Sequence, residues 1–331
     1  MNVLTRICRT MIAPLAIACA AAPLVAAAQS YPVKPIRIVV PYPPGGVDVY
    51  VRLLIPTMDQ ELGQPSIIEY KPGASGMIGT HYVSTVDPDG YTILWTASNP
   101  WVVTPAMRKE TPYDPVKSFT PITVVTEGVN VIVASMNFPP NNLKEMFDYA
   151  RKNELAWSTS GIGSSWHLDA ENMNRLAGTK ILHAPFKGFG PMFPALIAGR
   201  PPVALMTYSV TRRLVAAKKA KFLGTMSTKE KVRHLLPKGL QAVTDVLPKF
   251  EASSSWVGVG GPANLPREIV MRLNRALIKG IQTPEIQKRS LEDRIVATGN
   301  TPEEFAKLIK ADYELAVQSV RDSKIPLGIG A

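Results

Sequence analysis

Hydrophobic and polar positions in the first third of the chain alternate between patterns typical of strands and of helices. The β-branched run Ile36–Val40 predicts a buried strand, and the apolar spacing over 49–62 predicts a helix that ends at Gly63. The same patterns continue, with strands expected at 66–70 and 91–97 and a helix at 77–86. This β-α-β-α-β order predicts a parallel sheet with helices on both faces.

A second alternating set begins near Val129. Its expected strands cover 129–134, 156–160, 179–184 and 202–206, and its expected helices cover 142–152, 166–176, a segment ending at Ala198, and 210–217. Two long amphipathic helices finish the chain. The first opens at Leu265-Pro266, and the second opens at the capping box Thr301-Pro302-Glu303-Glu304. Two such sets within about 300 residues favour two domains.

The N-terminus has the pattern of an export signal. Arg6 and Arg9 precede an apolar, alanine-rich stretch over 11–25, and Ala26-Ala27-Ala28 offers a cleavage site. We therefore expect residues 1–28 to be a cleaved signal peptide and the protein to be periplasmic.

Two alternatives remain for the same segment. An uncleaved membrane anchor is disfavoured because the apolar stretch is short and is broken by Pro14 and Pro23. Lipid attachment at Cys19 is disfavoured because the preceding residues lack the usual leucine three positions earlier. Cleavage after Ala28 is the interpretation that fits both observations.

The cysteine and histidine content excludes several kinds of site. Cys8 and Cys19 are the only cysteines, so a chain cleaved after residue 28 has no disulfide, no thiolate metal site and no cysteine nucleophile. The four histidines show no metal-ligand spacing, and we expect neither a metal nor a cofactor.

The charge balance is basic. Loss of Arg6 and Arg9 lowers the formal net charge from +11 to +9. The basic residues are scattered and the chain carries an export signal, so we expect no nucleic-acid partner. A solvated basic surface is the favoured interpretation, and faster capture of anions is the alternative.

A glycine-rich turn follows the first strand. Pro43-Pro44-Gly45-Gly46-Val47-Asp48 leads directly into a helix, and backbone amides at a helix N-terminus bind anions. Asp48 either orients this turn or caps the helix, and the cap is favoured.

A second glycine turn, Gly161-Ile162-Gly163-Ser164-Ser165, precedes another helix. It resembles a dinucleotide fingerprint, but Trp166 replaces the third glycine and Ala177 lies near the position of the ribose-binding acid. We expect a second anion-binding turn, with hydroxyls from Ser160, Ser164 and Ser165. The alternative is that these serines only cap the helix, and both roles can hold at once.

The sequence contains little that indicates a catalytic site. Gly73-Ala74-Ser75-Gly76-Met77 misses the nucleophile elbow, and no Ser-His-Asp set is apparent. For His167 and His183, structural hydrogen bonding near a loop is favoured over catalysis. We expect no catalytic residue.

Aromatic residues recur at the ends of the expected strands: Tyr42, Trp101, Trp166, Phe186, Phe189 and Tyr208. Aromatic side chains often belong to the core. If these loops converge on one cleft, the rings suit a ligand with an apolar or aromatic body and a carboxylate head.

Six motifs follow one another along the chain after the expected signal. They are Tyr31-Pro32-Val33-Lys34-Pro35-Ile36-Arg37, Pro41-Tyr42-Pro43-Pro44-Gly45-Gly46, Lys71-Pro72-Gly73-Ala74-Ser75-Gly76, Asp87-Pro88-Asp89-Gly90-Tyr91-Thr92, Pro112-Tyr113-Asp114-Pro115 and His183-Ala184-Pro185-Phe186-Lys187-Gly188. By the order and spacing of these motifs, the chain resembles the Bug family of TctC-like solute receptors of tripartite tricarboxylate transporters. The resemblance covers essentially the whole chain after the signal.

This resemblance implies an α/β fold of the type II periplasmic-binding-protein class, a Venus flytrap whose two lobes each hold a mixed sheet flanked by helices. The implied lobes are 29–127 plus 254–331 and 128–253, with crossings near Glu127 and Ser254. The implied function is capture of a small organic carboxylate by a monomer, which delivers it to the membrane subunits of a tripartite tricarboxylate-type transporter.

Motif matches place ligand contacts in both lobes. With the residues drawn from the turns and aromatic loops, the expected ligand-binding set is Tyr42, Pro44, Gly45, Gly46, Asp48, Ser98, Asn99, Ser160, Gly163, Ser164, Ser165, Phe186, Lys187, Gly188 and Tyr208.

Three departures from the family pattern bear on the ligand. The first turn is shortened, Ser98-Asn99-Pro100-Trp101 replaces a small polar continuation, and Thr207-Tyr208 stands where Phe-Asp is common. The missing acid disfavours an amino-acid ligand, and the changes together favour a bulky or aromatic carboxylate. The alternative functions are a ligand-sensing receptor for a membrane sensor kinase and an exported hydrolase.

Overall fold

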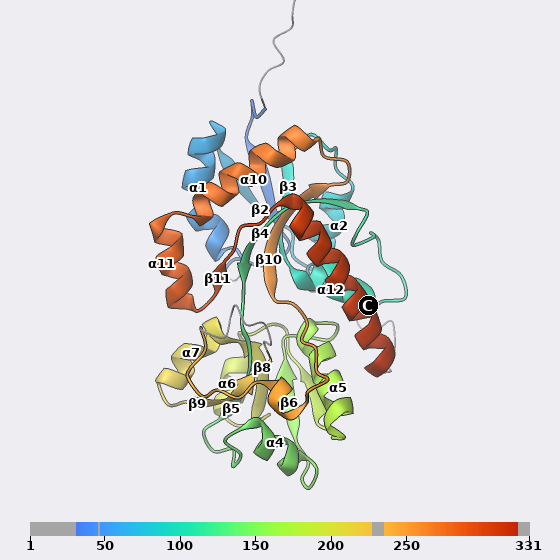
Figure 1. Ribbon diagram of the computed structural model, residues 1–331, viewed down its shortest axis with the longest axis vertical. Helices are drawn as coiled ribbons and strands as arrows, with labels where there is room; N and C mark the ends of the chain where they lie inside the picture. The colour runs from blue at the N-terminus through green and yellow to red at the C-terminus, as the bar shows by residue number, and fades with distance from the viewer. Residues whose placement is uncertain (1–30, 46, 227–234, 324–331) are drawn as a thin grey trace, which may run out of the picture.

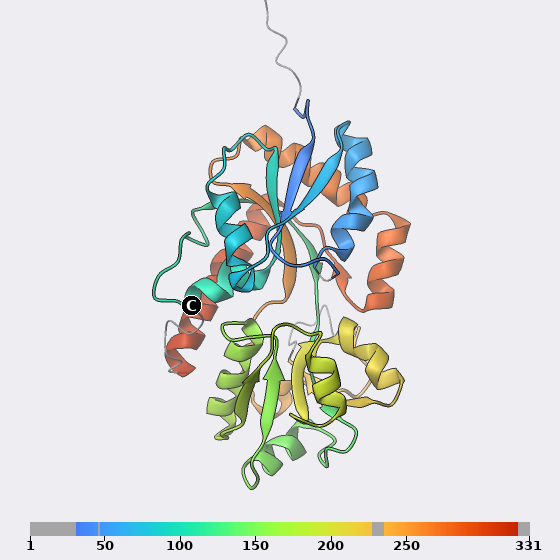
Figure 2. The same ribbon diagram turned by 180° about the vertical axis from the view of Figure 1, so that it is seen from behind.

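The strands of the protein form two separate sheets. The computed structural model describes residues 31–45, 47–226 and 235–323 and is drawn in Figure 1. A six-stranded sheet has the order β11-β4-β10-β3-β1-β2, and a five-stranded sheet has the order β7-β6-β8-β5-β9. The sheets occupy two lobes, one above the other in Figures 1 and 2.

The first sheet is mixed. Its strands are β1 (Ile36–Val40), β2 (Ser66–Tyr70), β3 (Thr92–Ala97), β4 (Phe119–Glu127), β10 (Trp256–Pro262) and β11 (Val296–Ala297). β1 pairs in parallel with β2 and β3, as the sequence predicts, whereas β10 runs antiparallel to both β3 and β4. The predicted parallel arrangement of the first three strands is therefore confirmed, and β10 makes the whole sheet mixed, as the resemblance implies.

Helices cover both faces of this sheet because its buried strands are apolar on both sides. The helices are α1 (Val49–Leu62), α2 (Met77–Ser84), α10 (Arg267–Ile281), α11 (Pro284–Asp293) and α12 (Pro302–Ser323), with short turns η1 (Ala74–Gly76), η2 (Asn99–Val103) and α3 (Thr104–Ala106). In β1, Ile36 and Ile38 pack in the core formed with α1 and α10. Val39 points the other way, into the core formed with α2 and α12.

The second sheet is also mixed. Its strands are β5 (Asn130–Ser135), β6 (Ala156–Thr159), β7 (Leu182–Pro185), β8 (Val203–Thr207) and β9 (Ala220–Thr225), and its helices are α4 (Leu143–Ala150), α5 (Ser165–Ala177), α6 (Met192–Ile197), α7 (Tyr208–Ala216) and α9 (Val243–Val246). β6 is parallel to β7 and β8, and β5 is antiparallel to β8 and β9.

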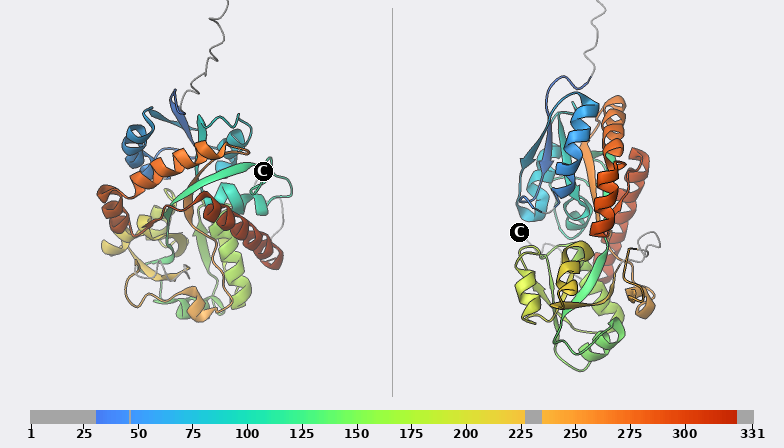
Figure 3. Two further views of the ribbon diagram at one scale, coloured as in Figure 1. Left: turned by 45° about the horizontal axis from the view of Figure 1, so that its top comes forward. Right: turned by 90° about the vertical axis from the view of Figure 1, so that its left-hand side faces the viewer.

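Within residues 31–45, 47–226 and 235–323, two segments connect the lobes. The chain leaves the first sheet between β4 and β5 and returns between α9 and β10 (Figure 3). The two segments contact each other, since the Gly128 amide donates to the Ser255 carbonyl at 2.6 Å. A carboxylate from each lobe binds the returning segment: Asp169 of α5 accepts from Ser253, and Asp312 of α12 accepts from the Ser254 hydroxyl. The lobe limits 29–127, 128–253 and 254–331 stay a prediction.

Sequence patterns missed β4, β9, β10 and α11. β10 lacks a strand pattern because glycines interrupt it, and packing explains two of them. A Cβ on Gly258 would lie 2.4 Å from the Phe305 ring, and one on Gly260 would lie 2.3 Å from the Trp101 ring. The glycines let these large rings pack directly on the strand.

Cap prediction succeeded at α12. The Thr301 hydroxyl accepts from the Glu304 amide at 3.2 Å, and the Glu304 carboxylate accepts from the Thr301 amide at 2.9 Å. Among the described residues, no helix is both long enough and apolar enough to span a membrane. The expected signal segment 1–28, including Cys19, lies outside the described residues.

Candidate functional site

The first glycine turn lies at the carboxyl end of β1. Pro44 and Gly45 are exposed, and Gly45 has a φ of 100°, a conformation that favours glycine. Gly46 lies outside the described residues. Tyr42, half-buried beside the turn, has a hydroxyl whose burial raises its pKa well above the ordinary value, so the hydroxyl keeps its proton at neutral pH.

Asp48 holds the turn and does not cap the helix. Its side chain is 1% exposed, and one carboxylate oxygen accepts the Gly45 amide at 2.8 Å. The other oxygen accepts from the Tyr70 hydroxyl at 2.7 Å and from Arg52 Nε at 2.9 Å. Within the described part of the chain, the carboxylate makes no cap bond to the first turn of α1. The prediction of a cap is therefore wrong, and the alternative of turn orientation is confirmed.

Replacement of Asp48 by alanine is expected to lower the free energy of unfolding by roughly 2 kcal/mol, because three donors lose their bonds to one charged, buried acceptor. The Gly45 amide should also exchange faster with solvent. Arg52→Ala is the matched control, since it removes one partner whose side chain is 56% exposed and should cost less than about 1 kcal/mol. Urea denaturation and hydrogen exchange measure both effects, and equal losses in the two variants would contradict this role of Asp48.

The second glycine turn lies at the carboxyl end of β6. Gly161 and Gly163 have φ angles of 147° and 76°. Ser164 is the N-cap of α5, and its hydroxyl accepts the His167 amide at 3.2 Å while donating to the Gly161 carbonyl at 2.8 Å. The prediction of serine capping is confirmed for Ser164. Ligand contact by the serines of this turn stays a prediction.

A stacked histidine pair supports this turn. The rings of His167 and His183 are 4.0 Å apart at 12°. His167 Nδ1 accepts the Gly163 amide at 3.3 Å, and His183 Nε2 lies 2.6 Å from the Thr159 hydroxyl. Burial lowers the pKa of each histidine to about 4, with a further contribution from His167 for His183. Both rings are therefore neutral at pH 7, and the prediction of structural hydrogen bonding is confirmed.

A segment of the first lobe bridges to the second turn. Asn99 Oδ1, in η2, accepts the Ser165 amide at 2.9 Å. The Thr104 hydroxyl, at the start of α3, donates to the Gly163 carbonyl at 3.3 Å. Because a backbone N–H can only donate, the amide oxygen of Asn99 faces Ser165, and its NH₂ group is the part able to donate to a ligand oxygen.

The loop after β7 lies beside the second turn. The Phe186 amide donates to the Thr159 carbonyl at 3.0 Å, and the Gly188 amide donates to the Ser160 carbonyl at 3.1 Å. Phe186 is half-buried and Lys187 is exposed. The structure thus brings these residues of the expected set together on the second lobe.

Two other expected site residues lie at the lobe connections. The Ser98 hydroxyl is 2.7 Å from the Ser254 carbonyl, to which it donates. The Tyr208 amide donates to the Val129 carbonyl at 2.8 Å, and the Tyr208 ring stacks on Phe222 at 5.1 Å. Both residues therefore contact the segments that connect the lobes.

The expectation that Trp101 lines a cleft is wrong. Its side chain is fully buried, with ring centroids 5.0 Å from Phe119, 5.9 Å from Trp256 and 5.4 Å from Phe305. Its indole N–H donates to the Pro115 carbonyl at 3.0 Å. The other rings of this cluster come from three segments that are distant in the sequence. The position of Trp101 after a strand therefore did not indicate that its side chain is buried.

Trp166 also belongs to a core. It packs in the interior of the second lobe, and its ring centroid is 5.0 Å from that of Phe189. Of the six aromatic residues, Tyr42, Phe186, Phe189 and Tyr208 are half-buried, and the first three lie on loops that carry the two glycine turns or lie beside them. The expected convergence of aromatic rings is therefore smaller than the sequence predicts.

Two links between the lobes were not predicted. They are Thr104 with Gly163 and the ion pair of Arg212 with Asp293, at 3.2 Å. The partners of the ion pair are 81 residues apart in sequence. Each charge has the ordinary pattern of a solvated helix face, and no local signal pairs them.

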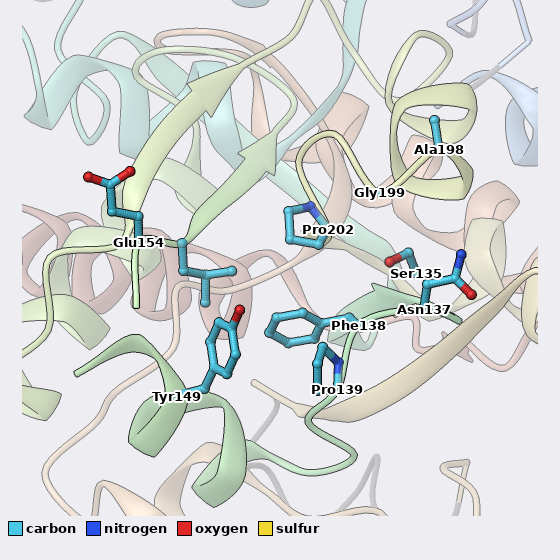
Figure 4. A pocket seen from close by; sticks show the side chains of 10 residues that line it. Ser135, Asn137, Phe138, Pro139, Tyr149, Glu154, Ala198, Gly199 and Pro202 are labelled. Atoms are coloured by element: carbon cyan, nitrogen blue, oxygen red, sulfur yellow. The ribbon is translucent and has the colours of Figure 1, made fainter. Parts of the chain in front are cut away.

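A cavity of about 280 Å³ lies elsewhere, at the far end of the second lobe. Its lining includes Ser135, where β5 ends, and Leu155 and Pro202, which precede β6 and β8. Figure 4 shows the rings of Phe138 and Tyr149 at its centre. It opens at the strand ends opposite to the second glycine turn, so it is separate from the candidate site.

Sequence comparisons give consistent matches. The family model described as "Tripartite tricarboxylate transporter family receptor" matches residues 50–316. A curated relative from Pseudomonas sp. (strain P51), the UPF0065 protein in the tcbD-tcbE intergenic region, is 31% identical over 293 residues, which cover 86% of this chain and 85% of the relative.

Solved structures share the fold over nearly their whole length. The periplasmic binding protein BugD has a TM-score of 0.78 at 29% identity, covering 89% of this chain and 99% of its own. A Rhodopseudomonas palustris protein with adipate has a TM-score of 0.80 at 25% identity, covering 89% and 99%. MatC from the same species, with bound malate, has a TM-score of 0.77 at 25% identity, covering 88% and 100%.

Proposed function

The chain belongs to the TctC family of tripartite tricarboxylate transporter receptors, and on that premise we propose that it captures a small organic carboxylate between its lobes. The captured ligand passes to the membrane subunits of a transporter of this class. In this proposal the protein is exported by cleavage of residues 1–28, works in the periplasm as a monomer, and performs no catalysis.

One observation supports the proposal above the others. Each lobe carries a glycine turn at the carboxyl end of a strand, and the Asn99–Ser165 bond joins the first lobe to the second turn. Strand-end turns of α/β sheets are preferred ligand sites, and their backbone amides favour anions. The adipate and malate bound to structural relatives are both dicarboxylates.

The ligand-facing groups we propose carry no negative charge. Gly45 offers backbone, and Asn99 offers an NH₂ donor whose orientation follows from its bond to Ser165. Asp48 is buried on its protein partners. Such a site suits a ligand that brings acceptor oxygens, and the described residues that we assign to it offer no carboxylate to bind an amino group.

The class of carboxylate is proposed from the half-buried rings of Tyr42 and Phe186. Trp101 and Trp166 lie in the cores, Phe189 packs on Trp166, and Tyr208 stacks on Phe222. Tyr42 and Phe186 are the remaining two of the six rings. We propose that they accommodate the apolar body of a bulky or aromatic carboxylate.

A thermal-shift screen tests the proposal. Adipate, malate, succinate and citrate form one panel, benzoate and phenylacetate form a second, and glutamate and its amide form the control. A ligand at 100 times its Kd stabilises the folded state by about 2.7 kcal/mol, which appears as a Tm rise of several degrees. Stabilisation by aromatic acids alone supports the bulkier ligand, and stabilisation by succinate or citrate alone overturns it. If none of these carboxylates raises the Tm, the proposed function itself is overturned.

The partner is tested by genetics. Genes for two transporter membrane subunits beside this one support uptake, and their deletion should abolish growth on the identified ligand. A neighbouring sensor-kinase gene without transporter genes would instead favour ligand sensing, which uses the same closed lobes.

A further inference from the structure

An ion pair joins the lobes beside the first glycine turn. Arg212 of α7, in the second lobe, is 3.2 Å from Asp293 at the end of α11, in the first lobe. α11 lies directly above α7 in Figure 1, and the reverse view in Figure 2 agrees. The pair lies on the other side of the molecule from α5, which begins at Ser165 (Figure 1).

Asp293 is held in place by its own lobe. Its second carboxylate oxygen accepts from Arg289 Nε at 2.6 Å and from the Tyr50 hydroxyl at 3.3 Å. The Asp293 side chain is 13% exposed, whereas that of Arg212 is 30% exposed. The acceptor is therefore preorganised when Arg212 arrives, so forming the link orders one side chain and not two.

Tyr50 connects this carboxylate to the candidate site. It lies in the first turn of α1, two positions after Asp48, which holds the Gly45 amide. The same helix end thus carries both the glycine turn and a partner of Asp293. A ligand that orders this turn also orders the acceptor of the cross-lobe link.

We propose that Arg212 is a positioning residue for ligand capture: its ion pair with Asp293 holds the lobes in the closed arrangement and slows their reopening. The claim about lobe position stands on the contacts, and the claim about ligand residence rests on the proposed function. In an open arrangement Arg212 is solvated and Asp293 keeps its bonds to Arg289 and Tyr50, so only the difference between the two states favours closure.

The attraction between Arg212 and Asp293 is partly offset, so closure of the lobes is reversible. Within the described residues, Arg212 Nε is buried without a hydrogen-bond partner. The desolvation of this donor offsets part of the attraction between Arg212 and Asp293. We therefore expect a link that biases the lobes toward closure and still lets them separate.

The experiment needs no ligand. Small-angle scattering gives the radius of gyration, and amide-resolved hydrogen exchange follows Ser165, whose acceptor belongs to the other lobe. Arg212→Met keeps the aliphatic stem and removes the charge. It should exchange the Ser165 amide about fivefold faster and raise the radius of gyration. Arg212→Lys should recover part of the wild-type behaviour, because it keeps the charge without the planar fork.

Two further variants make the outcome specific. Arg213 is the exposed neighbour of Arg212 on α7, and Arg213→Met, the control, should match the wild type. Arg289→Met releases the carboxylate that Arg289 holds in place, so it should speed Ser165 exchange, but less than Arg212→Met does. Salt at 0.5 M should speed Ser165 exchange in the wild type more than in Arg212→Met.

The outcomes separate this proposal from the proposed function. Unchanged exchange and radius in Arg212→Met, or equal changes in Arg213→Met, overturn the positioning role whatever the ligand screen finds. A silent ligand screen with faster Ser165 exchange overturns carboxylate capture and leaves the positioning of the lobes supported. Where a carboxylate binds, its dissociation rate should rise about fivefold in Arg212→Met, with an unchanged association rate.

Discussion

Replacement of Trp101 by alanine is expected to lower the free energy of unfolding by about 3–5 kcal/mol, the usual cost of removing a large aromatic side chain from a core. The ring is fully buried among Phe119, Trp256 and Phe305. The variant also removes the donor to the Pro115 carbonyl. The lost contacts come from three segments, so the surrounding chain can collapse only partly into the cavity.

The same variant should weaken the bridge to the second turn. Trp101 lies in η2, two positions after Asn99, whose amide oxygen accepts from Ser165. Loosening η2 should therefore speed exchange of the Ser165 amide. Urea denaturation measures the stability loss, and hydrogen exchange measures the loss of the bridge.

Phe186→Ala provides the contrast. Phe186 is a half-buried aromatic residue on a loop beside the second turn, and its loss should cost less than about half as much as the loss of Trp101. A ligand-lining Trp101 would show the opposite pattern, with near-normal stability and a large loss of affinity. That pattern would contradict the core position of Trp101.

The second large effect is a pH dependence of stability that Asp169→Asn should steepen. Burial lowers the pKa of His167 and of His183 from 6.5 to about 4. Their contribution to the stability of the folded protein is complete above about pH 6.5, because both rings are then neutral in the folded and in the unfolded state. It is lost as the pH falls toward 4, because the unfolded chain then binds two protons that the folded protein excludes.

Asp169 acts in the opposite direction. Burial raises its pKa from 3.8 to about 7, against the two bonds donated by Ser253. Its contribution is complete below about pH 3.8 and is lost as the pH rises toward 7, because the folded protein holds a proton that the unfolded chain releases. Between roughly pH 4 and 6.5, unfolding therefore takes up two histidine protons and releases one from Asp169.

The net uptake of one proton gives a slope of about 1 kcal/mol per pH unit, after allowance for screening at the half-exposed His183. Asp169→Asn keeps an oxygen for Ser253 and removes the opposing proton, so the slope should roughly double. Urea denaturation at several pH values from 4.5 to 6.5 measures the difference between the two proteins. Other carboxylates cancel in that difference, and parallel curves would show that Asp169 does not carry the proton.

Sequence patterns correctly predicted those helices and strands whose apolar spacing and end signals both lie within or next to the element. The strand at β1 and the helix at α1 match their expected limits of 36–40 and 49–62. These elements have apolar periodicity and clear ends, such as the left-handed Gly63 after α1. β10 failed because Gly258 and Gly260 serve the rings that pack on them, and those rings come from other parts of the chain.

The candidate site, too, was predictable only in part. The glycine turns follow from strand, turn and helix within a few residues, and the sequence located both. The roles of their side chains depended on distant partners. Asp48 bonds Tyr70 and Gly45 instead of capping α1, and the Ser98 hydroxyl bonds the Ser254 carbonyl at a lobe connection.

By itself, the sequence determined the family, the alternation of strands and helices, and the two turns able to bind an anion. These properties lie in residue types and short spacings, which local backbone preferences and hydrophobic periodicity express directly. Only the tertiary structure decided that Trp101 is core, that Asn99 meets Ser165, and that Arg212 meets Asp293. Each of these depends on side chains brought together by the packing of two lobes, and no short stretch of the chain contains both partners.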